Sequence, residues 1–246
     1  MYKEISEKET HIPYKRVLLK LSGEAFGLEG VGLNLDSVAH VAETLAMVRH
    51  NTGVEMAIVV GAGNLFRGRY IEGTSVDRVT ADYIGMMGTI MNAMALQEAM
   101  ERLGNNTRVM SAIPINNLCE PFIRRKAIRH LEKGRMVILG GGTGNPFCTT
   151  DSASALRAAE LGCQVLLKAS NIDAVYDKDP RKHKNARRFD KISYQFALEN
   201  GLKVMDMEAF ARCQEAKIPT IIFNFDKPDN IEKIIKGESL GTLITV

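Results

Sequence analysis

The 246-residue sequence predicts an α/β fold built around a mostly parallel β-sheet. Short runs of aliphatic and β-branched residues alternate with segments of helical periodicity, which is typical of consecutive βαβ units. Glycine-rich segments follow three of the strand-like runs, at 22–32, 61–68 and 140–144. Because ligands of open parallel sheets bind beyond the carboxyl ends of the strands, these segments also indicate where a ligand would bind.

Seven strand-like runs make up the predicted sheet. Each is short and rich in aliphatic residues, the composition of parallel strands that are buried on both faces. In chain order they cover residues 17–21, 54–60, 107–111, 135–139, 164–168, 220–225 and 242–246.

Helical patterns lie between these runs. They cover 34–50, 74–103, 121–132, 151–161 and 206–216, and the first has Asn34 or Asp36 as its N-cap. We expect the methionines of the second pattern to pack in the core or against a helix of another subunit, rather than to bind a ligand. They are Met86, Met87, Met91, Met94 and Met100. The charged segment 177–188 has no apolar period and is predicted to be a solvated loop, which can still border a ligand site.

No low-complexity linker or internal repeat divides the sequence. We therefore expect a flexible N-terminal tail at 1–13 and a single domain over 14–246. The tail is charged and has no apolar core, so it is not predicted to be a signal peptide. No apolar run is long enough to span a bilayer, and the expected location is the cytoplasm.

Charge and side-chain chemistry argue against several classes of function. The 32 basic and 29 acidic residues give a net charge of +3, whereas duplex nucleic-acid binders have a stronger and clustered positive field. The four cysteines have no CxxC spacing, and the five histidines form no ligand pair. We therefore expect no disulfide, no metal held by the protein alone, and no nucleic acid as the main ligand.

The glycine-rich segments are suited to binding phosphate. Glycine allows backbone N–H groups to approach phosphate oxygens closely, and a helix N-terminus that follows adds partial positive charge. The sequence has no Gly-Lys dipeptide and hence no Walker A loop. In the segment that begins at Gly61, the third glycine is Gly68, too late for a dinucleotide fingerprint, and the residues before Asp82 look helical.

Two lysines lie in runs that are otherwise apolar. Lys20 lies in VLLKLSG, which ends in Ser22-Gly23, and Lys168 lies in the similar run VLLKAS. An ammonium group in a buried strand is costly unless it meets an anion, so we favour anion binding by Lys20 over a side chain that reaches solvent at the strand end. Lys168 raises the same question more weakly.

Two further charged residues lie beside the glycines. Arg67, in GNLFRG, is suited to holding phosphate oxygens with its guanidinium. Without its neighbours, a surface position would be equally expected. Asp151 opens a helical pattern directly after GGGTGNPFCTT. Its carboxylate is expected to cap that helix, to orient Lys20 or a magnesium ion, or to do both.

An ordered set of motifs closely resembles the bacterial UMP kinases of the amino acid kinase superfamily. The motifs are KLSGEA, GAGNLFRG, DRVTADYIGM, SAIP, GTGNPFCTTDSA, KASNIDAVYDKDP and LKVMD, and the match runs from Tyr14 to the terminal GTLITV. The resemblance implies a three-layer αβα sandwich of the amino acid kinase (carbamate kinase-like) fold. It also implies transfer of a phosphoryl group from ATP to UMP with magnesium, in a homohexamer that GTP activates and UTP inhibits.

The resemblance assigns roles residue by residue, with Lys20, Arg67 and Asp151 as the expected catalytic residues. The expected ATP contacts are Lys20, Leu21, Ser22, Gly23, Gly63, Arg67, Ser170, Asn171, Tyr176 and Asp179. The expected UMP contacts are Ala62, Asp82, Thr143, Gly144, Asn145, Pro146, Phe147, Cys148, Thr149 and Thr150. The expected allosteric GTP segment comprises Gly27, Leu28, Glu29, Gly30, Val31 and Gly32.

Two departures from the family pattern and the absence of one lysine affect these assignments, and the segment 23–32 varies in length in the family. Ala62 stands where glycine is usual, so its φ should be negative. Ser170 replaces a more usual threonine and keeps the hydroxyl. Some superfamily relatives that phosphorylate carboxylates carry a second catalytic lysine near Met205–Asp206, and its absence here favours a phosphate acceptor.

Two alternatives remain open from the sequence alone. A kinase of the same fold would act on an amino-acid carboxylate such as aspartate or acetylglutamate. A nucleotide-sensing regulator would lack turnover and could contact DNA through Arg124, Arg125, Lys126 and Arg129. Lys20 and Asp151 together favour catalysis, and the charge requirements of joining two polyanions agree with the lysine, arginine and backbone N–H groups present.

Overall fold

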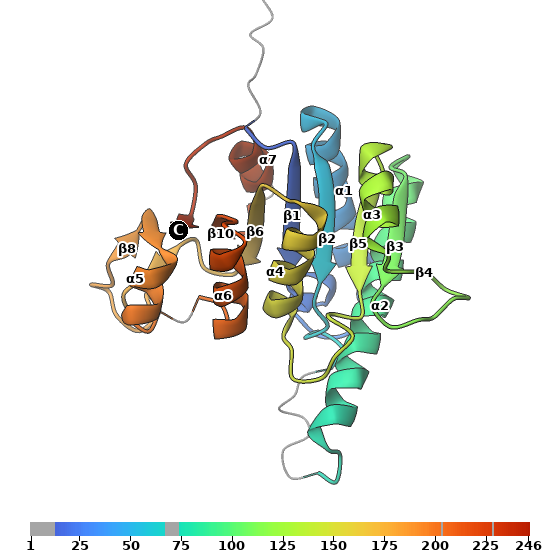
Figure 1. Cartoon of the computed structure of the whole chain (residues 1–246), viewed down its shortest axis with the longest axis horizontal. Helices are drawn as coiled ribbons and strands as arrows, with labels where there is room; N and C mark the ends of the chain where they lie inside the picture. Colours follow the sequence, from blue (N-terminus) through green and yellow to red (C-terminus); the bar gives the residue numbers. More distant parts are fainter. Residues whose placement is uncertain (1–12, 67–73, 203, 228) are drawn as a thin grey trace, which may run out of the picture.

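The computed structural model describes residues 13–66, 74–202, 204–227 and 229–246. Its main sheet has nine strands in the order β4-β3-β5-β2-β1-β6-β10-β11-β9. Every pairing in this sheet is parallel except that of β10 with β11. Helices cover both faces of the sheet (Figure 1), so the predicted α/β sandwich with a mostly parallel sheet is confirmed.

The seven predicted strand runs all form strands, within two residues of the expected bounds. They are β1 (Arg16–Leu21), β2 (Glu55–Val60), β3 (Thr107–Ser111), β5 (Met136–Gly140), β6 (Val165–Ser170), β10 (Thr220–Asn224) and β11 (Thr242–Thr245). Short strands that the sequence did not indicate are β4 (Glu120–Pro121), β9 (Lys191–Ser193) and the separate hairpin of β7 (Val175–Tyr176) with β8 (Arg188–Phe189). The charged segment after β7 is a mostly exposed loop, as predicted.

The predicted helices are also present. They are α1 (Leu35–Thr52), α2 (Arg78–Arg102), α3 (Arg124–Glu132), α4 (Thr150–Leu161) and α6 (Met207–Glu215). The unpredicted ones are short: the 3₁₀ turn η1 (Gly23–Phe26), α5 (Tyr194–Glu199) and α7 (Asp229–Ile235). Asn34 caps α1, as expected, by accepting a 2.8 Å hydrogen bond from the N–H of Ser37. α2 begins later than expected because Asp77 caps it, and α3 does so because Glu120–Pro121 pairs with β3.

The core lies in two layers, one on each face of the sheet. Val17, Leu19 and Leu21 of β1 pack with residues of α1, α2 and α7, whereas Leu18 packs with residues of α3, α4 and α6. Each of these four β1 side chains is 0% exposed, which explains why the strand shows no polar alternation. The loops that follow β1, β2 and β5 are therefore held at one edge of a rigid sheet, at the bottom of Figure 1.

The methionines of α2 divide between two environments. Met86 and Met100 are buried, as expected for core packing, while Met87, Met91 and Met94 are 37–52% exposed. Among the described residues, no helix has the length and apolar character needed to span a membrane. The expected tail at 1–13 lies almost wholly outside the described residues, and so does Arg67.

Candidate functional site

The loops after β1 and β2 meet at the carboxyl edge of the sheet. The N–H of Gly61 donates to the carbonyl of Leu21 at 2.9 Å. A Cβ atom added to Gly23 would lie 2.5 Å from the backbone nitrogen of Gly63 and 2.8 Å from the carbonyl carbon of Ala62. Only glycine fits at position 23, because the two backbones approach this closely. The first two glycine-rich segments therefore form one continuous surface.

Asp151 bridges the two strand lysines. Its Oδ1 lies 3.5 Å from Nζ of Lys20, and its Oδ2 lies 2.5 Å from Nζ of Lys168. The three side chains are only 14–16% exposed. Lys20 and Lys168 are register partners on the adjacent strands β1 and β6, which brings the two ammonium groups to the same carboxylate. The anion that the sequence required for Lys20 is thus the carboxylate of Asp151 within the protein itself.

The environment of Lys168 lowers its pKa. Burial is the largest cause, the Asp151 carboxylate opposes it, and the neighbouring Lys20 ammonium lowers the pKa further. Lys168 Nζ also donates to the carbonyl of Val204 at 2.5 Å. Lys168 was not among the expected site residues, because the pairing of β1 with β6 is not visible in the sequence.

The expected capping role of Asp151 is wrong. Thr149 is the N-cap of α4, and its Oγ1 accepts hydrogen bonds from the N–H groups of Asp151 and Ser152 at 3.0 and 3.2 Å. Like a carboxylate, a threonine hydroxyl can accept hydrogen bonds from the first-turn N–H groups. The carboxylate of Asp151 is consequently available to the lysines.

Asp206 contributes to the site although it was not among the expected site residues. It caps α6 by accepting from the N–H of Ala209 at 2.8 Å, and it also accepts from the hydroxyls of Ser152 and Thr149. Burial alone would raise its pKa, but these hydrogen bonds and the Lys168 charge outweigh burial and lower it. Asp206 therefore ties the start of α4 to α6. The motif LKVMD contained this residue, but nothing in its spacing indicated the contact with α4.

Two adjoining cavities contain most of the expected ATP contacts. One, of about 290 Å³, is lined by Lys20, Leu21, Ser22, Ser170 and Asn171, among others. The next, of about 570 Å³, is lined by Ser170, Tyr176, Asp179 and the start of the charged loop. Both cavities include Lys168 and Ser170, so they form one elongated site. Their combined size is in the range of small-molecule sites.

A third cavity, of about 340 Å³, contains most of the expected UMP contacts. Its lining includes Ala62, Asp82, Thr143, Asn145, Cys148, Thr149 and Thr150. Gly63 also lines this cavity rather than the first two. Gly144, Pro146 and Phe147 belong to the same loop but are not among the lining residues. Positive φ among the described non-glycine residues is confined to Glu29, Phe147 and Lys217, so Ala62 has the negative φ that was expected.

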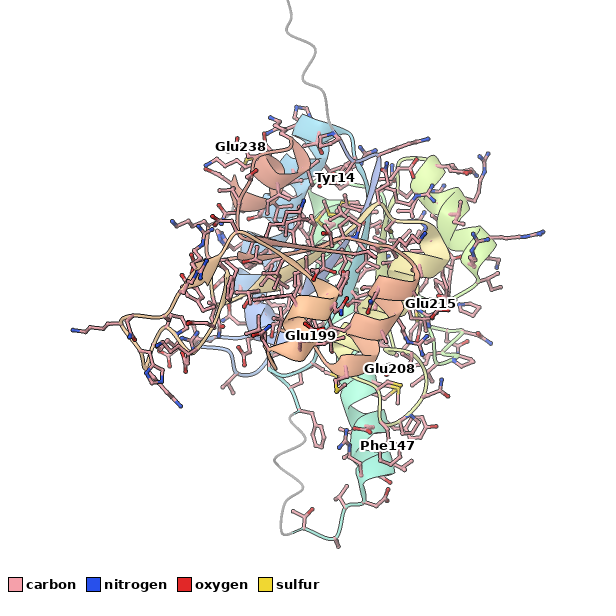
Figure 2. All side chains as sticks on the ribbon, turned by 60° about the vertical axis from the view of Figure 1, so that its left-hand side comes forward. Tyr14, Phe147, Glu199, Glu208, Glu215 and Glu238 are labelled. Atoms are coloured by element: carbon pink, nitrogen blue, oxygen red, sulfur yellow. The ribbon has the colours of Figure 1, made fainter. Side chains whose placement is uncertain are left out.

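Asp82 joins α2 to the loop 143–150. Both of its carboxylate oxygens accept from Nε of Arg78 at 2.9 Å, and Oδ2 accepts from the N–H of Phe147 at 2.8 Å. Phe147 has a φ of 64° and is 68% exposed, with the Arg78 guanidinium 5.6 Å from its ring. Figure 2 shows Phe147 beside the N-terminal end of α2. Asp82 thus lines the third cavity and also fixes the loop that forms its wall.

The expected GTP segment forms a small hairpin. Leu28 and Val31 form an antiparallel bridge around Glu29 and Gly30, whose φ angles of 49° and 79° are those of a tight two-residue turn. Gly32 then bonds to Asn64, with its N–H 2.8 Å from the Asn64 carbonyl. The hairpin is thereby attached to the loop after β2.

Comparison with known proteins defines the family. A model of the amino acid kinase family matches residues 15–224. The structure is similar to UMP kinase from Bacillus anthracis, with a TM-score of 0.91, 40% identity, and coverage of 94% of this chain and 96% of that one. UMP kinase from Ureaplasma parvum gives 0.88 and 34%, with coverage of 94% and 99%. Uridylate kinase from Archaeoglobus fulgidus gives 0.71 and 28%, with coverage of 93% and 99%.

The chain belongs to the amino acid kinase family and is a phosphotransferase. The narrower resemblance to the bacterial UMP kinases, expected from the ordered motifs, is confirmed by the two solved UMP kinases at 40% and 34% identity.

Proposed function

We propose that the chain transfers the γ-phosphoryl group of ATP to UMP, giving ADP and UDP for pyrimidine nucleotide biosynthesis. The observation that carries this proposal is the Lys20–Asp151–Lys168 cluster, in which one buried carboxylate holds two lysines at the elongated cavity. Lys20 and Lys168 line the elongated cavity, and Thr149 and Thr150, next to Asp151 in the sequence, line the third cavity. The similarity to solved UMP kinases supports UMP as the acceptor.

The chemistry requires charge compensation more than proton transfer. The second pKa of a phosphate monoester is about 6, so UMP is largely a dianion at neutral pH and needs no general base. One of its phosphate oxygens forms the new bond to the γ-phosphorus as the bond to the β–γ bridging oxygen breaks and ADP leaves. Lys20 and Lys168 would neutralise the charge that develops on the transferred group, while Asp151 holds both ammonium groups in place.

Magnesium is proposed to arrive with ATP. Oδ1 of Asp151 is buried and has no hydrogen-bond partner among the described residues, and carboxylate and phosphate oxygens are ligands that magnesium prefers. The lysines beside this oxygen favour an ion held mainly by the nucleotide phosphates. Bound there, magnesium would neutralise charge on the β- and γ-phosphates.

The acceptor is tested by measuring ADP release with UMP, CMP, aspartate and acetylglutamate in turn. We expect turnover with UMP to exceed that with each of the others by at least about tenfold. Turnover with a carboxylate substrate alone would assign the same fold to a different reaction. ATP binding without turnover on any acceptor would favour a nucleotide-sensing regulator.

The resemblance to the bacterial UMP kinases also implies a homo-oligomer, expected to be a hexamer. On the same basis we propose activation by GTP, inhibition by UTP and a cytoplasmic location. An exposed apolar stripe on α2 supports self-association. Tyr83, Met87, Met91 and Met94 recur at helical spacing and are 37–52% exposed. Sedimentation should give a mass several times that of the 27.2 kDa chain, and Met91→Glu should reduce it.

A further inference from the structure

A pair of buried asparagines joins the loop after β2 to helix α2. Nδ2 of Asn64 donates to Oδ1 of Asn92 at 3.1 Å, and Nδ2 of Asn92 donates to Oδ1 of Asn64 at 2.8 Å. Asn64 is 5% exposed and Asn92 is 0% exposed. Primary amides are costly to bury unless they are hydrogen-bonded, whereas an apolar pair would fill the same space without needing partners. Packing alone therefore does not account for these two asparagines.

The remaining amide hydrogens of this pair hold two loops. Nδ2 of Asn92 donates to the carbonyl of Gly61 at 2.8 Å, and Nδ2 of Asn64 donates to the carbonyl of Gly32 at 2.7 Å. A Cβ atom on Gly23 would lie 2.6 Å from Oδ1 of Asn64, so the first glycine-rich loop rests against the same amide. The Asn64–Asn92 pair thus connects α2 to the loops after both β1 and β2.

The same stretch of α2 also holds the loop after β5. Oγ1 of Thr89 accepts a hydrogen bond from the N–H of Gly141 at 2.7 Å, in a buried position. A Cβ atom on Gly88 would lie 2.9 Å from Cβ of Ala62. Thr89 and Asn92 are three residues apart and so lie on neighbouring positions of one helix face. One turn of α2 is therefore hydrogen-bonded to both the loop after β2 and the loop after β5, and both loops line the third cavity.

We propose that Asn92 and Thr89 are positioning residues, which fix the loops after β2 and β5 relative to each other so that donor and acceptor phosphates align. Asn92 acts through Asn64 and the Gly61 carbonyl. Thr89 lines the third cavity and acts through the Gly141 N–H. The inference rests on the proposed phosphoryl transfer. Transfer between two bound nucleotides depends on alignment, and misplacement by about 1 Å can cost roughly 10²-fold in rate.

The test compares Asn92→Ala and Thr89→Val with Thr52→Val as a matched control. The control removes a buried hydroxyl at the C-terminal end of α1, which donates to the carbonyl of Val48 at 2.7 Å and accepts from the N–H of Val54 at 3.3 Å. Neither partner belongs to the loops after β2 and β5. We expect kcat to fall roughly 10- to 100-fold in each α2 variant, with KM for ATP and UMP changed less than about threefold. The control should have a lower Tm than the parent protein but the same kcat. Thr89→Val preserves side-chain volume, so it decides the matter if Asn92→Ala does not fold.

Hydrogen exchange gives a readout that does not depend on the substrate. Asn92→Ala should speed exchange of the amides at 61–66, Thr89→Val should speed it at 141–145, and the control should do neither. Near-normal kcat in both folded α2 variants, or unchanged exchange in these loops, would overturn the proposal. If the parent protein made no UDP, the proposed function would fail, while the exchange results would still decide whether α2 holds the loops.

Discussion

Oγ1 of Thr149 accepts the backbone N–H of Asp151 at 3.0 Å, so a threonine hydroxyl caps α4 while the Asp151 side chain turns to the lysines. Capping and charge pairing, which the sequence could not separate at Asp151, thus belong to two neighbouring residues. A substitution at Asp151 therefore probes the charge without removing the cap.

Asp151→Asn should lower kcat roughly 10²- to 10³-fold, because the lysines lose the carboxylate that holds them in place. The lost charged hydrogen bond should cost about 1.5–3 kcal/mol of folding stability. Glu55→Gln is the matched control: Glu55 pairs with Arg16 at 2.6 Å, and the two side chains are 16% and 13% exposed. The Tm of the control should fall by a similar amount to that of Asp151→Asn, and its kcat should not change. If Asp151→Asn kept kcat within about threefold, Asp151 would have a structural role only.

Lys20→Met should abolish most turnover and leave the fold intact. Methionine fills the space of the lysine stem in an apolar strand, but it removes a cation beside the transferred group. We expect kcat to fall roughly 10²- to 10³-fold, with Tm equal to or above that of the parent. Steady-state kinetics and a thermal melt measure both quantities. Near-normal kcat at saturating substrate would remove Lys20 from the site.

The lowered pKa of Lys168 predicts an early alkaline limit on activity. If the ammonium is required, kcat/KM for ATP should fall as pH rises through a pKa below the ordinary lysine value of about 10.4. Between the lowered pKa and the ordinary one, the unfolded chain binds the extra proton, so stability attributable to Lys168 should rise with pH. Lys168→Arg, which stays charged, should move the alkaline limit upward. An identical profile in that variant would show that another group sets it.

Asp82 is predicted to distinguish UMP from dUMP by accepting a hydrogen bond from a ribose hydroxyl. Such a bond to a charged group is worth about 1.5–3 kcal/mol, or roughly 10- to 150-fold in kcat/KM. Because Asp82 also holds the N–H of Phe147, Asp82→Ala should lower turnover of both nucleotides, and the ratio is the informative quantity. We expect the UMP/dUMP ratio to approach one.

Glu98→Ala serves as the control for Asp82, because Glu98 forms an exposed i,i+4 pair with Arg102 on the same helix. It should leave the UMP/dUMP ratio unchanged. If Asp82→Ala reduced kcat/KM equally for both nucleotides, Asp82 would act through the loop alone and would not contact the sugar.

The sequence predicted those parts of the fold that depend on local patterns. The runs around Val17 and Val54 have the composition of buried strands, and helix α1 shows both its periodicity and its Asn34 cap. Helices α5 and α7 were missed because six or seven residues are too few to display a period. Strands β7 to β9 are shorter still.

The site was predictable where a single residue conflicted with its surroundings. Lys20 in an apolar strand implied an anion nearby, but its partner depended on strand order. Lys168 reaches Asp151 because β1 lies beside β6, a pairing that requires the assembled sheet. Asp206 contacts Ser152 across 54 residues of sequence, and no local pattern encodes that contact.

The most direct test of the account is to follow the phosphoryl group itself. The protein is incubated with UMP, magnesium and ATP labelled at the γ-phosphate, and the nucleotides are separated. The label should appear in UDP, with one UDP formed for each ADP, and Lys20→Met should form almost none. Label released as free phosphate, or ADP formed without labelled UDP, would contradict the assignment of UMP as the acceptor.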